Sequence, residues 1–199
     1  MNRCARFLLS AGMFAFALLA QAADGDAARG EKLAYTCLGC HGIEHYKNSY
    51  PKYSVPKLGG QNAAYIRDAL RQYEAGSRWH PTMRGYASTL SDQDRRDLAA
   101  YFDSVASGSA GSEPVGTPPK SAAACVACHG TNGRGTMDEY PDLAGQHADY
   151  LAQALNDYRL GKRKSPLMQP FAQQLTRADI EALANFFSKQ PGLETPSLD

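Results

Sequence analysis

The sequence predicts an all-α protein made of two tandem domains of one fold, joined by a linker rich in Gly, Pro and Ser. Sliding the chain on itself by 85 positions aligns residues 56–105 with 141–190 without a gap, and 19 of the 50 aligned pairs are identical. Apolar residues recur at helical spacing in both copies, and no segment alternates as a strand would. A duplication with its own helical pattern in each copy indicates two similar domains.

Composition divides the 199-residue chain into a leader, two copies and a linker. Residues 1–22 have a basic start, an apolar run and a small-x-small ending at Ala22. The run is roughly 14 residues where about 20 would span a bilayer, so we expect a signal peptide cleaved near Ala22. Residues 107–120 combine Gly, Pro and Ser and predict an extended linker. The predicted domains are therefore 23–106 and 121–199.

Each copy is expected to contain two well-marked helices. The first ends at a glycine, Gly76 or Gly161, where a left-handed cap is favoured. The second begins at an S/T-x-x-D pattern that starts with Ser91 or Thr176, which is typical of a helix N-terminus. The apolar stripes of these helices are interpreted as domain cores.

Charge and motif content exclude several classes of function. The chain has 21 Lys and Arg against 20 Asp and Glu, a formal net charge of +1. Such a balance provides no positive field for a phosphate backbone, so we expect no nucleic-acid partner. The sequence also lacks G-x-S-x-G, a phosphate-binding glycine loop and a dinucleotide fingerprint. The common hydrolase and nucleotide-dependent classes are therefore disfavoured.

The four cysteines that follow the leader form two C-x-x-C-H motifs. The motif residues are Cys37, Cys40 and His41 in the first copy and Cys125, Cys128 and His129 in the second. On a helical turn, positions i and i+3 share a face and can bond two vinyl groups of one haem, while position i+4 directs its imidazole at the iron. Two such motifs in a tandem repeat predict two covalently bound haem c groups.

Other interpretations of the cysteine pairs fit the sequence less well. A thioredoxin-type pair would be followed by a parallel-sheet pattern, and a zinc ribbon would space its pairs about 15 to 20 residues apart. A local zinc cluster of Cys37, Cys40, His41 and His45 is the strongest rival, but Gly133 replaces His45 in the second copy. A disulfide within each cysteine pair is the remaining alternative for a chain that carries no haem.

The repeat also indicates a distal ligand for each iron. Met83 and Met168 are the only methionines at matching positions, and each lies two residues after a proline. We expect the proline to hold the preceding segment extended, as suits a loop that carries a thioether across a haem face. Packing as core residues is the alternative role. His80 and His147 are competing ligands, but neither has a histidine counterpart in the other copy. The predicted axial pairs are His41 with Met83 and His129 with Met168.

Two local features distinguish the copies. The motifs are offset by 88 positions rather than 85, so the first copy has three extra residues in the Tyr-rich segment 45–53. The basic run 162–164 in the second copy is interpreted as a solvated turn, with a partner contact as the alternative.

The tandem arrangement resembles the dihaem cytochromes c of the cytochrome c4 type, exported bacterial electron carriers built from two class I cytochrome c domains. The resemblance covers nearly all of residues 25–190 and rests on both C-x-x-C-H motifs, both P-x-L-x-G-Q segments, both Met positions and both terminal helices. It implies that the carbonyl of Pro56 or Pro141 accepts a hydrogen bond from the histidine below the haem. It also implies haem propionates near the domain interface.

The same resemblance implies a first helix that begins before the motif and packs against the last helix of the domain. Small and aromatic residues such as Gly30 and Tyr35 would lie at this crossing. In the second copy Pro118 and Ala123 occupy those positions. The linker then leaves room only for a short helix from about Ser121, which puts the crossing of the second domain in question.

An iron with His and Met on its two faces has no open position for a substrate, so we expect an electron carrier and not an enzyme. The hypothesis is a soluble periplasmic cytochrome that shuttles single electrons from a quinol-oxidising complex or dehydrogenase to a terminal oxidase or reductase of a respiratory chain. The alternative is a dihaem peroxidase or the cytochrome subunit of a periplasmic dehydrogenase. We expect a monomer, free in the periplasm or loosely associated with a membrane.

Overall fold

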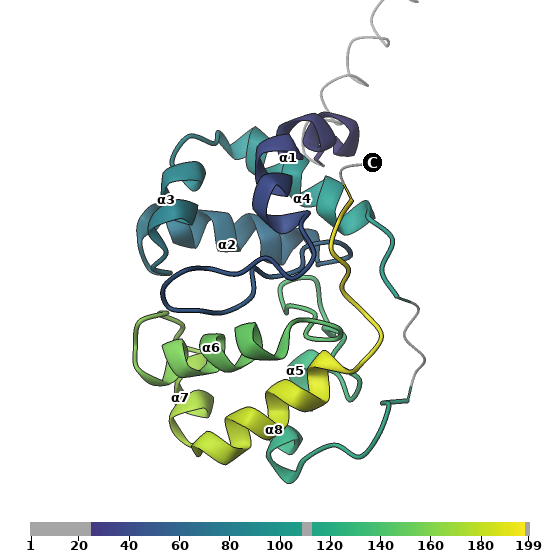
Figure 1. The fold of residues 1–199 in the computed structure, drawn as a ribbon, viewed down its shortest axis with the longest axis vertical. Helices are drawn as coiled ribbons and strands as arrows, with labels where there is room; N and C mark the ends of the chain where they lie inside the picture. Colours follow the sequence, from purple (N-terminus) through teal and green to yellow (C-terminus); the bar gives the residue numbers. More distant parts are fainter. Residues whose placement is uncertain (1–24, 109–112, 198–199) are drawn as a thin grey trace, which may run out of the picture.

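The computed structural model describes residues 25–108 and 113–197, and the predicted signal peptide lies outside the described residues. Two helical domains lie one above the other, with the earlier part of the chain in the upper domain of Figure 1. Between helices, the described residues form loops with three isolated β-bridges and no extended strand. The all-α prediction is therefore confirmed.

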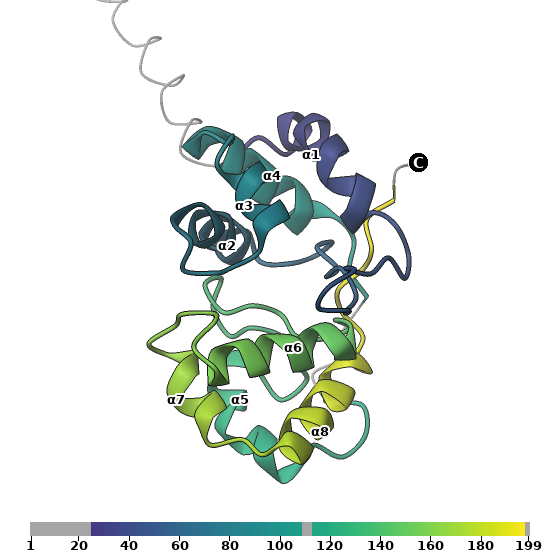
Figure 2. The ribbon, with the colours of Figure 1, turned by 60° about the vertical axis from the view of Figure 1, so that its left-hand side comes forward.

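The first domain has four helices arranged around a small apolar core. They are α1 (Ala27–His41), α2 (Ala63–Ala75), α3 (Pro81–Ala87) and α4 (Asp92–Ser104). Helix α1 crosses α4, and α2 packs against both α3 and α4 (Figure 2). The core is formed by Ala34, Leu38, Ile66, Leu98, Ala99 and Phe102.

The crossing of α1 and α4 depends on a glycine. A Cβ atom at Gly30 would lie 1.9 Å from the backbone carbonyl oxygen of Asp97, so only glycine permits this approach. Gly30, Ala34 and Leu38 form the buried stripe of α1 at spacings of four residues. The expectation for Tyr35 was wrong, because Tyr35 follows the stripe by one position, is rotated away from α4 and is 75 % exposed.

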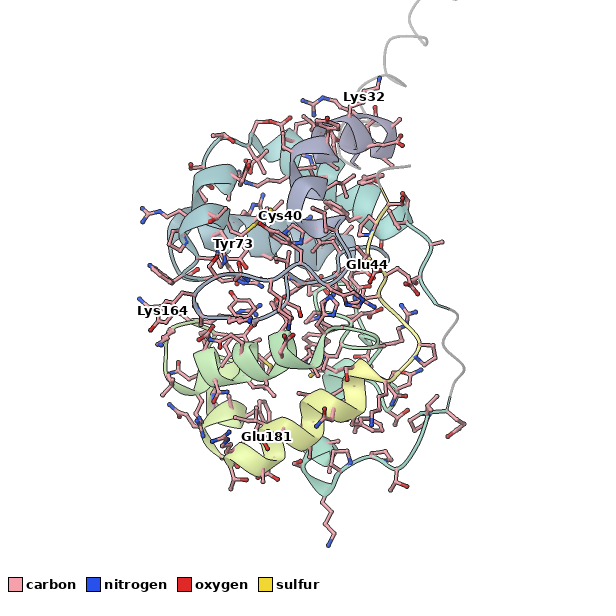
Figure 3. The ribbon with its side chains drawn as sticks, viewed as in Figure 1. Lys32, Cys40, Glu44, Tyr73, Lys164 and Glu181 are labelled. Atoms are coloured by element: carbon pink, nitrogen blue, oxygen red, sulfur yellow. The ribbon has the colours of Figure 1, made fainter. Side chains whose placement is uncertain are left out.

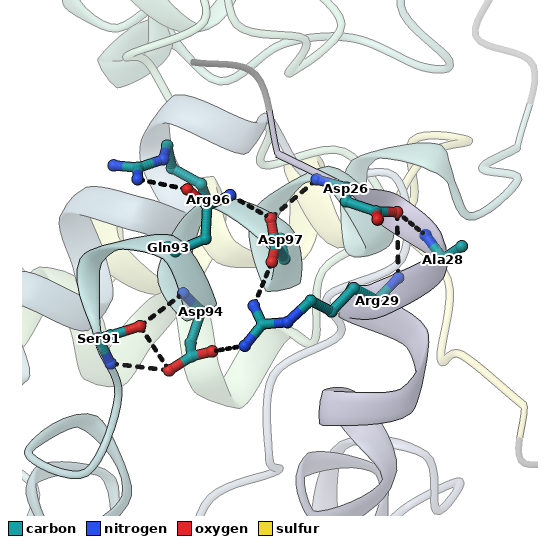
Figure 4. A network of polar contacts seen from close by, with 8 residues as sticks. All are labelled: Asp26, Ala28, Arg29, Ser91, Gln93, Asp94, Arg96 and Asp97. Carbon is teal, nitrogen blue, oxygen red and sulfur yellow. Dashed lines mark hydrogen bonds and ion pairs between the residues drawn. The ribbon is translucent and has the colours of Figure 1, made fainter. Parts of the chain in front are cut away.

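A polar network closes the same crossing at the start of α1 (Figure 4). The Asp97 carboxylate, whose side chain is 1 % exposed, accepts hydrogen bonds from the backbone N–H of Asp26 at 2.8 Å and from the Gln93 amide at 2.7 Å. The Arg29 guanidinium forms ion pairs with Asp97 and Asp94. Because the buried carboxylate has several donors, the network stabilises the crossing.

The second domain begins with much shorter helical segments. Its elements are the 3₁₀-helix η1 (Lys120–Ala124) and the helices α5 (Val126–His129), α6 (Ala148–Arg159), α7 (Met168–Gln173) and α8 (Arg177–Ser188). The expected short helix near Ser121 is confirmed, and Ala122 is buried in the core between η1 and α8. The other core residues are Leu151, Leu183, Ala184, Phe186 and Phe187.

The expected helix ends are present in both copies. Gly76 ends α2 with a φ of 75°, and Gly161 follows α6 with a φ of 70°. Ser91 and Thr176 each cap a terminal helix with a reciprocal capping box to the aspartate three residues later. The sequence predicted these helix ends correctly because they depend on residues that are close together in the chain.

The domains meet through the glutamines of the two P-x-L-x-G-Q segments. The Gln61 amide donates to the Asp142 carbonyl oxygen at 3.0 Å and accepts from the Asp142 backbone N–H at 2.9 Å. The Gln146 amide makes the same pair of hydrogen bonds with the backbone of Lys57, each at 3.0 Å. Both glutamines are 3 % exposed. The two copies of one motif therefore bind each other reciprocally.

Two further segments bridge the domains. After α8 the chain runs back beside the first domain (Figure 1), where Gly59 and Glu194 exchange backbone hydrogen bonds of 3.0 and 3.1 Å. In the Tyr-rich segment 45–53, Lys47 forms an ion pair with Asp149 of α6 at 2.6 Å. The predicted second domain 121–199 thus includes a tail that packs on the first.

Candidate functional site

One continuous cavity of about 1200 Å³ runs through both domains. This exceeds the roughly 300–1000 Å³ of a pocket for one small ligand. All ten predicted site residues line it: Cys37, Cys40, His41, Pro56, Met83, Cys125, Cys128, His129, Pro141 and Met168. Sequence reasoning placed these residues in two sites, and the structure joins the sites in one hollow at the domain interface.

The two C-x-x-C-H motifs lie on different lengths of helix. The first occupies the last turn of the 15-residue helix α1, while the second occupies the four-residue helix α5 and the residue before it. All four cysteines are half-buried, and no disulfide joins them. Burial raises the pKa of the Cys37 and Cys125 thiols before they are bonded to haem. One helical turn is enough to direct each motif into the cavity.

The motif histidines are held in one orientation and one tautomer. The Nδ1 atom of His41 lies 2.8 Å from the Pro56 carbonyl oxygen, and that of His129 lies 2.9 Å from the Pro141 carbonyl oxygen. A carbonyl oxygen only accepts, so Nδ1 carries the proton and Nε2 keeps its lone pair. Burial lowers the pKa of His41 to about 4 and also lowers that of His129. Both rings are thus neutral, the form that binds a metal.

The methionines lie on short helices, so the expectation of a loop was wrong, whereas the expected extended segment is present before Pro81. Met83 is the third residue of α3, and Met168 is the first residue of α7. The backbone before the first of these helices is extended at His80, whose φ and ψ are −163° and 109°. Pro81 then starts the helix, because its fixed φ suits the first helical position and its missing N–H is not needed there.

His80 has a structural role that the sequence comparison missed. Its Nδ1 accepts a hydrogen bond from the Met83 backbone N–H at 3.2 Å, and its Nε2 lies 3.2 Å from the Asn48 side-chain oxygen. In the second domain, the Ser165 hydroxyl accepts from the Met168 N–H at 3.1 Å. His80 is the N-cap residue of α3, whereas Ser165 lies two residues before Leu167, the N-cap residue of α7, yet both side chains accept the N–H of the corresponding methionine. The other competing histidine, His147, is not among the residues that line the cavity.

The basic run of the second domain is buried at its centre, so its interpretation as a solvated turn was wrong there. Arg163 is only 6 % exposed, and its Nη2 donates to the Tyr65 hydroxyl of the first domain at 3.0 Å. The flanking Lys162 and Lys164 are exposed, and Lys164 projects from the edge of the molecule in Figure 3. Arg78, the counterpart of Arg163 in the repeat, is also buried, with 7 % of its surface exposed.

Comparison with known proteins shows the family. The model of the Cytochrome c family matches residues 27–106 and 120–190, one match in each domain. The chain belongs to the cytochrome c family. Because each domain brings its own motif, this cytochrome carries two covalent haem c groups, at the motifs of Cys37 and Cys40 and of Cys125 and Cys128.

Several relatives that match most of the chain are named cytochrome c4. Cytochrome c4 of Pseudomonas aeruginosa is 36 % identical over 185 residues, which cover 82 % of this chain and 88 % of the relative. The crystal structure of reduced recombinant cytochrome c4 from Pseudomonas stutzeri has a TM-score of 0.67 and 34 % identity, and covers 83 % of this chain and 99 % of that one. The chain is thus a dihaem electron-transfer cytochrome of the c4 type.

A further relative carries a more specific name. The thiosulfate dehydrogenase electron acceptor of Stutzerimonas stutzeri is 32 % identical over 197 residues, which cover 88 % of this chain and 90 % of the relative. Among the described residues, no helix of this cytochrome has the length and apolar character needed to cross a bilayer.

Proposed function

We propose that this cytochrome is a monomeric, periplasmic carrier that accepts single electrons from one redox protein and delivers them to another. The donor would be a quinol-oxidising complex or a dehydrogenase, and the acceptor a terminal oxidase or reductase. One observation carries the proposal: both motif histidines and both paired methionines line a single cavity that spans the two domains. Two redox groups in one cavity suit a relay of electrons within one molecule.

Different residues of the cavity lining would hold each haem in different ways. Cys37 and Cys40, and Cys125 and Cys128, would form the thioether bonds. His41 and His129 would bind the irons from one side and Met83 and Met168 from the other. The bound groups supply one-electron exchange, with a potential raised by the thioether ligand. The carbonyls of Pro56 and Pro141 keep each imidazole oriented with Nε2 free.

If His and Met occupy both axial positions of each iron, as proposed, the protein would be a carrier rather than an enzyme. A dihaem peroxidase needs one iron that opens to its substrate, so one haem of the resting protein would be high-spin and would bind cyanide. The proposed His and Met pairs leave no such position in either domain. Docking to partners would be small and transient, as is usual for redox encounters.

The ligand assignment is tested by three substitutions. Met83→Ala and Met168→Ala should each remove half of the weak long-wavelength charge-transfer band of Met-ligated ferric haem and open one haem to cyanide. Met137→Ala is the matched control, because Met137 is 52 % exposed and does not line the cavity. A high-spin, cyanide-binding haem in the unmodified protein would favour the peroxidase, and loss of the band in the control would contradict the assignment by making Met137 a ligand.

The relative named as an electron acceptor supports one of these two donors, a periplasmic dehydrogenase such as thiosulfate dehydrogenase. Rapid mixing of the oxidised cytochrome with such a dehydrogenase and thiosulfate should then reduce both haems within one enzyme turnover. Reduction only by a quinol-oxidising complex would instead support the respiratory shuttle.

The export proposal has its own measurement. The mass of the protein purified from a periplasmic fraction should equal that of the chain after Ala22 plus two haems. A protein that keeps residues 1–22, or that sediments with membranes at high salt, would contradict a free periplasmic carrier.

A further inference from the structure

One buried arginine joins the three helices around the Met83 segment of the first domain. Arg95 belongs to α4 and is 5 % exposed. Its Nη2 donates to the Glu74 carboxylate of α2 at 2.7 Å and to the Ala87 carbonyl oxygen of α3 at 3.2 Å, and its Nη1 donates to Asp92 at 3.0 Å. These three helices lie together in the upper domain of Figure 2. The guanidinium therefore links the helix that carries Met83 to both of its neighbours.

The contact with Ala87 supports the end of α3. The last carbonyls of a helix have no partner within it and need donors from elsewhere. Ala87 is the last residue of α3 and is fully buried, and its carbonyl oxygen accepts from the Leu90 backbone N–H at 3.3 Å as well as from Arg95. Met83 precedes Ala87 by about one helical turn, so the position of this helix end is transmitted directly to the methionine.

The second domain holds its methionine helix without such an arginine. Ile180 takes the place of Arg95 and is 2 % exposed, and both carboxylates are replaced by arginines. The carbonyl oxygen of Ala172, at the position of Ala87, accepts from the Leu175 backbone N–H at 3.2 Å. An aliphatic side chain fits this buried position of the fold, so packing alone does not require an arginine there.

Stability alone does not explain the burial of Arg95 either. Removing a charge from water is costly, and a buried ion pair often contributes no more stability than apolar residues of similar size. Among the described residues, the buried Nε of Arg95 has no hydrogen-bond partner, which adds to this cost. Arg95 does not line the cavity, so its effect on the first haem must pass through α3.

We propose that Arg95 is a positioning residue for the first haem, because its bridge from α4 to α2 and to the end of α3 opposes the movement that would take Met83 off the iron. The proposal rests on the proposed ligation by Met83. A thioether ligand raises the potential of the iron, so a firmly held Met83 keeps the first haem at one potential while electrons pass. The second haem, with Ile180 in place of Arg95, should be independent of this bridge.

The test uses imidazole, an external ligand that binds the ferric haem only when the methionine leaves. In the holoprotein with Met168→Ala, the remaining Met charge-transfer band reports on Met83 alone. Adding Arg95→Leu should raise the affinity of the first haem for imidazole about tenfold, as expected for loss of a hydrogen bond from a charged group. Arg96→Leu is the matched control, because Arg96 is the next residue of α4 and its guanidinium donates to Gln93 of the same helix at 2.6 Å.

The second haem separates positioning from a general structural role. In the holoprotein with Met83→Ala, the band that belongs to Met168 should respond to imidazole equally with and without Arg95→Leu. Equal imidazole affinities of the first haem in Arg95→Leu and Arg96→Leu would overturn the proposal. An equal rise at both haems, together with a lower denaturant midpoint, would also overturn it, because that result indicates a loss of stability of the whole protein.

A second variant covers the case in which Arg95→Leu does not fold. Glu74→Gln removes one negative charge from the bridge at a half-exposed position, so it should raise the imidazole affinity of the first haem alone, by less than Arg95→Leu would. An unchanged affinity in this variant would overturn the proposal. Absence of the band from Met168→Ala with Arg95 intact would contradict the ligation by Met83 in the proposed function, and this proposal with it.

Discussion

The two domains share a sequence skeleton but support their C-x-x-C-H motifs by different means. In the first domain a 15-residue helix crosses α4 before it reaches the motif. In the second, a five-residue 3₁₀-helix and a four-residue α-helix are enough. Both motifs nevertheless reach the cavity, and both histidines make the same hydrogen bond to a proline carbonyl. The long helix therefore serves the stability of the first domain rather than the geometry of the site.

The polar contacts of the domains differ in the same way. The buried Asp97 of the first domain holds the start of α1, and Ala182 takes its place in the repeat. In the second domain, Gln190 is 2 % exposed and its amide bonds both the N–H and the carbonyl oxygen of Val115, at 2.7 and 2.9 Å. One domain anchors a helix with a carboxylate, and the other anchors the incoming linker with an amide.

The largest effect is expected from the glycine of the α1 crossing. Gly30→Ala places a Cβ atom against backbone that has no room to move, so it should destabilise the protein by about 3 kcal/mol through overpacking. Gly39→Ala, in the same helix, meets nothing within 4 Å and should stabilise by about 0.5–1 kcal/mol because alanine is the better helix former. Denaturant titration of the helical signal compares them. Equal effects of the two would mean that α1 does not depend on the crossing.

The next effect concerns the carboxylate that closes this crossing. Asp97→Ala leaves the Asp26 N–H and the Arg29 guanidinium without their buried acceptor and should cost about 2 kcal/mol. Hydrogen exchange of amides in α1 and α4 should rise, while that in α6 and α8 should not. A matched loss of protection in both domains would show that the domains unfold as one unit. The Asp97 network would then not stabilise the first domain separately.

Sequence patterns predicted the features that depend on residues close together in the chain. Capping boxes, the glycine helix ends and the short start of the second domain follow from local chemistry, and all are present. The shared cavity and the domain interface did not follow, because they depend on long-range contacts. The sequence did contain a signal for the interface. Gln61 and Gln146 are identical polar residues at matching positions of the two copies, and each binds the backbone of the other domain.

The segments that carry the methionines show that a local sequence signal can also be misinterpreted. Proline signals both an extended preceding residue and a helix start, and here both are realised within one residue of each other. His80 and Ser165 looked unrelated because a sequence comparison scores residue types. The His80 ring nitrogen accepts the Met83 N–H, and the Ser165 hydroxyl oxygen accepts the N–H of its counterpart, Met168. The roles of the site residues as thioether and axial ligands remain predictions for the variants described above.

Removal of the side-chain acceptors of His80 and Ser165 should have similar, moderate effects in the two domains. His80→Ala and Ser165→Ala each expose the N–H of the following methionine and should weaken its helix by about 1 kcal/mol. The Met charge-transfer band should then disappear at a lower denaturant concentration, in one haem for each variant. His80→Ser should restore the band in the first domain, since serine performs this role in the second. Failure of that rescue would mean that the bond from His80 to Asn48 matters more than the cap.

The smallest expected difference between the domains appears in acid. Hydrogen bonds from the Ser91 side chain and backbone, followed by the contact with Arg29, lower the pKa of Asp94 to about 2 from its ordinary 3.8. Burial opposes the same shift at Asp97, but hydrogen bonds from Asp26, Arg29 and Gln93 overcome it and lower that pKa too. A carboxyl with a lowered pKa stabilises the folded state above its ordinary value, and this stabilisation is lost as the pH falls towards the folded value.

In the second domain, Asp179 repeats the arrangement of Asp94, with its pKa lowered by the hydroxyl and backbone of Thr176. Burial raises the pKa of Asp149, but hydrogen bonds from Lys47 and Ser54 overcome this and lower it. Between pH 3.8 and about 2 the first domain should therefore take up more protons on unfolding and lose protection in α1 and α4 sooner than the second domain does in α8. Hydrogen exchange across this range measures the difference, and Asp97→Asn should reduce it, because an amide does not titrate there. A difference that persists unchanged in the Asn variant would place its origin outside the α1 crossing.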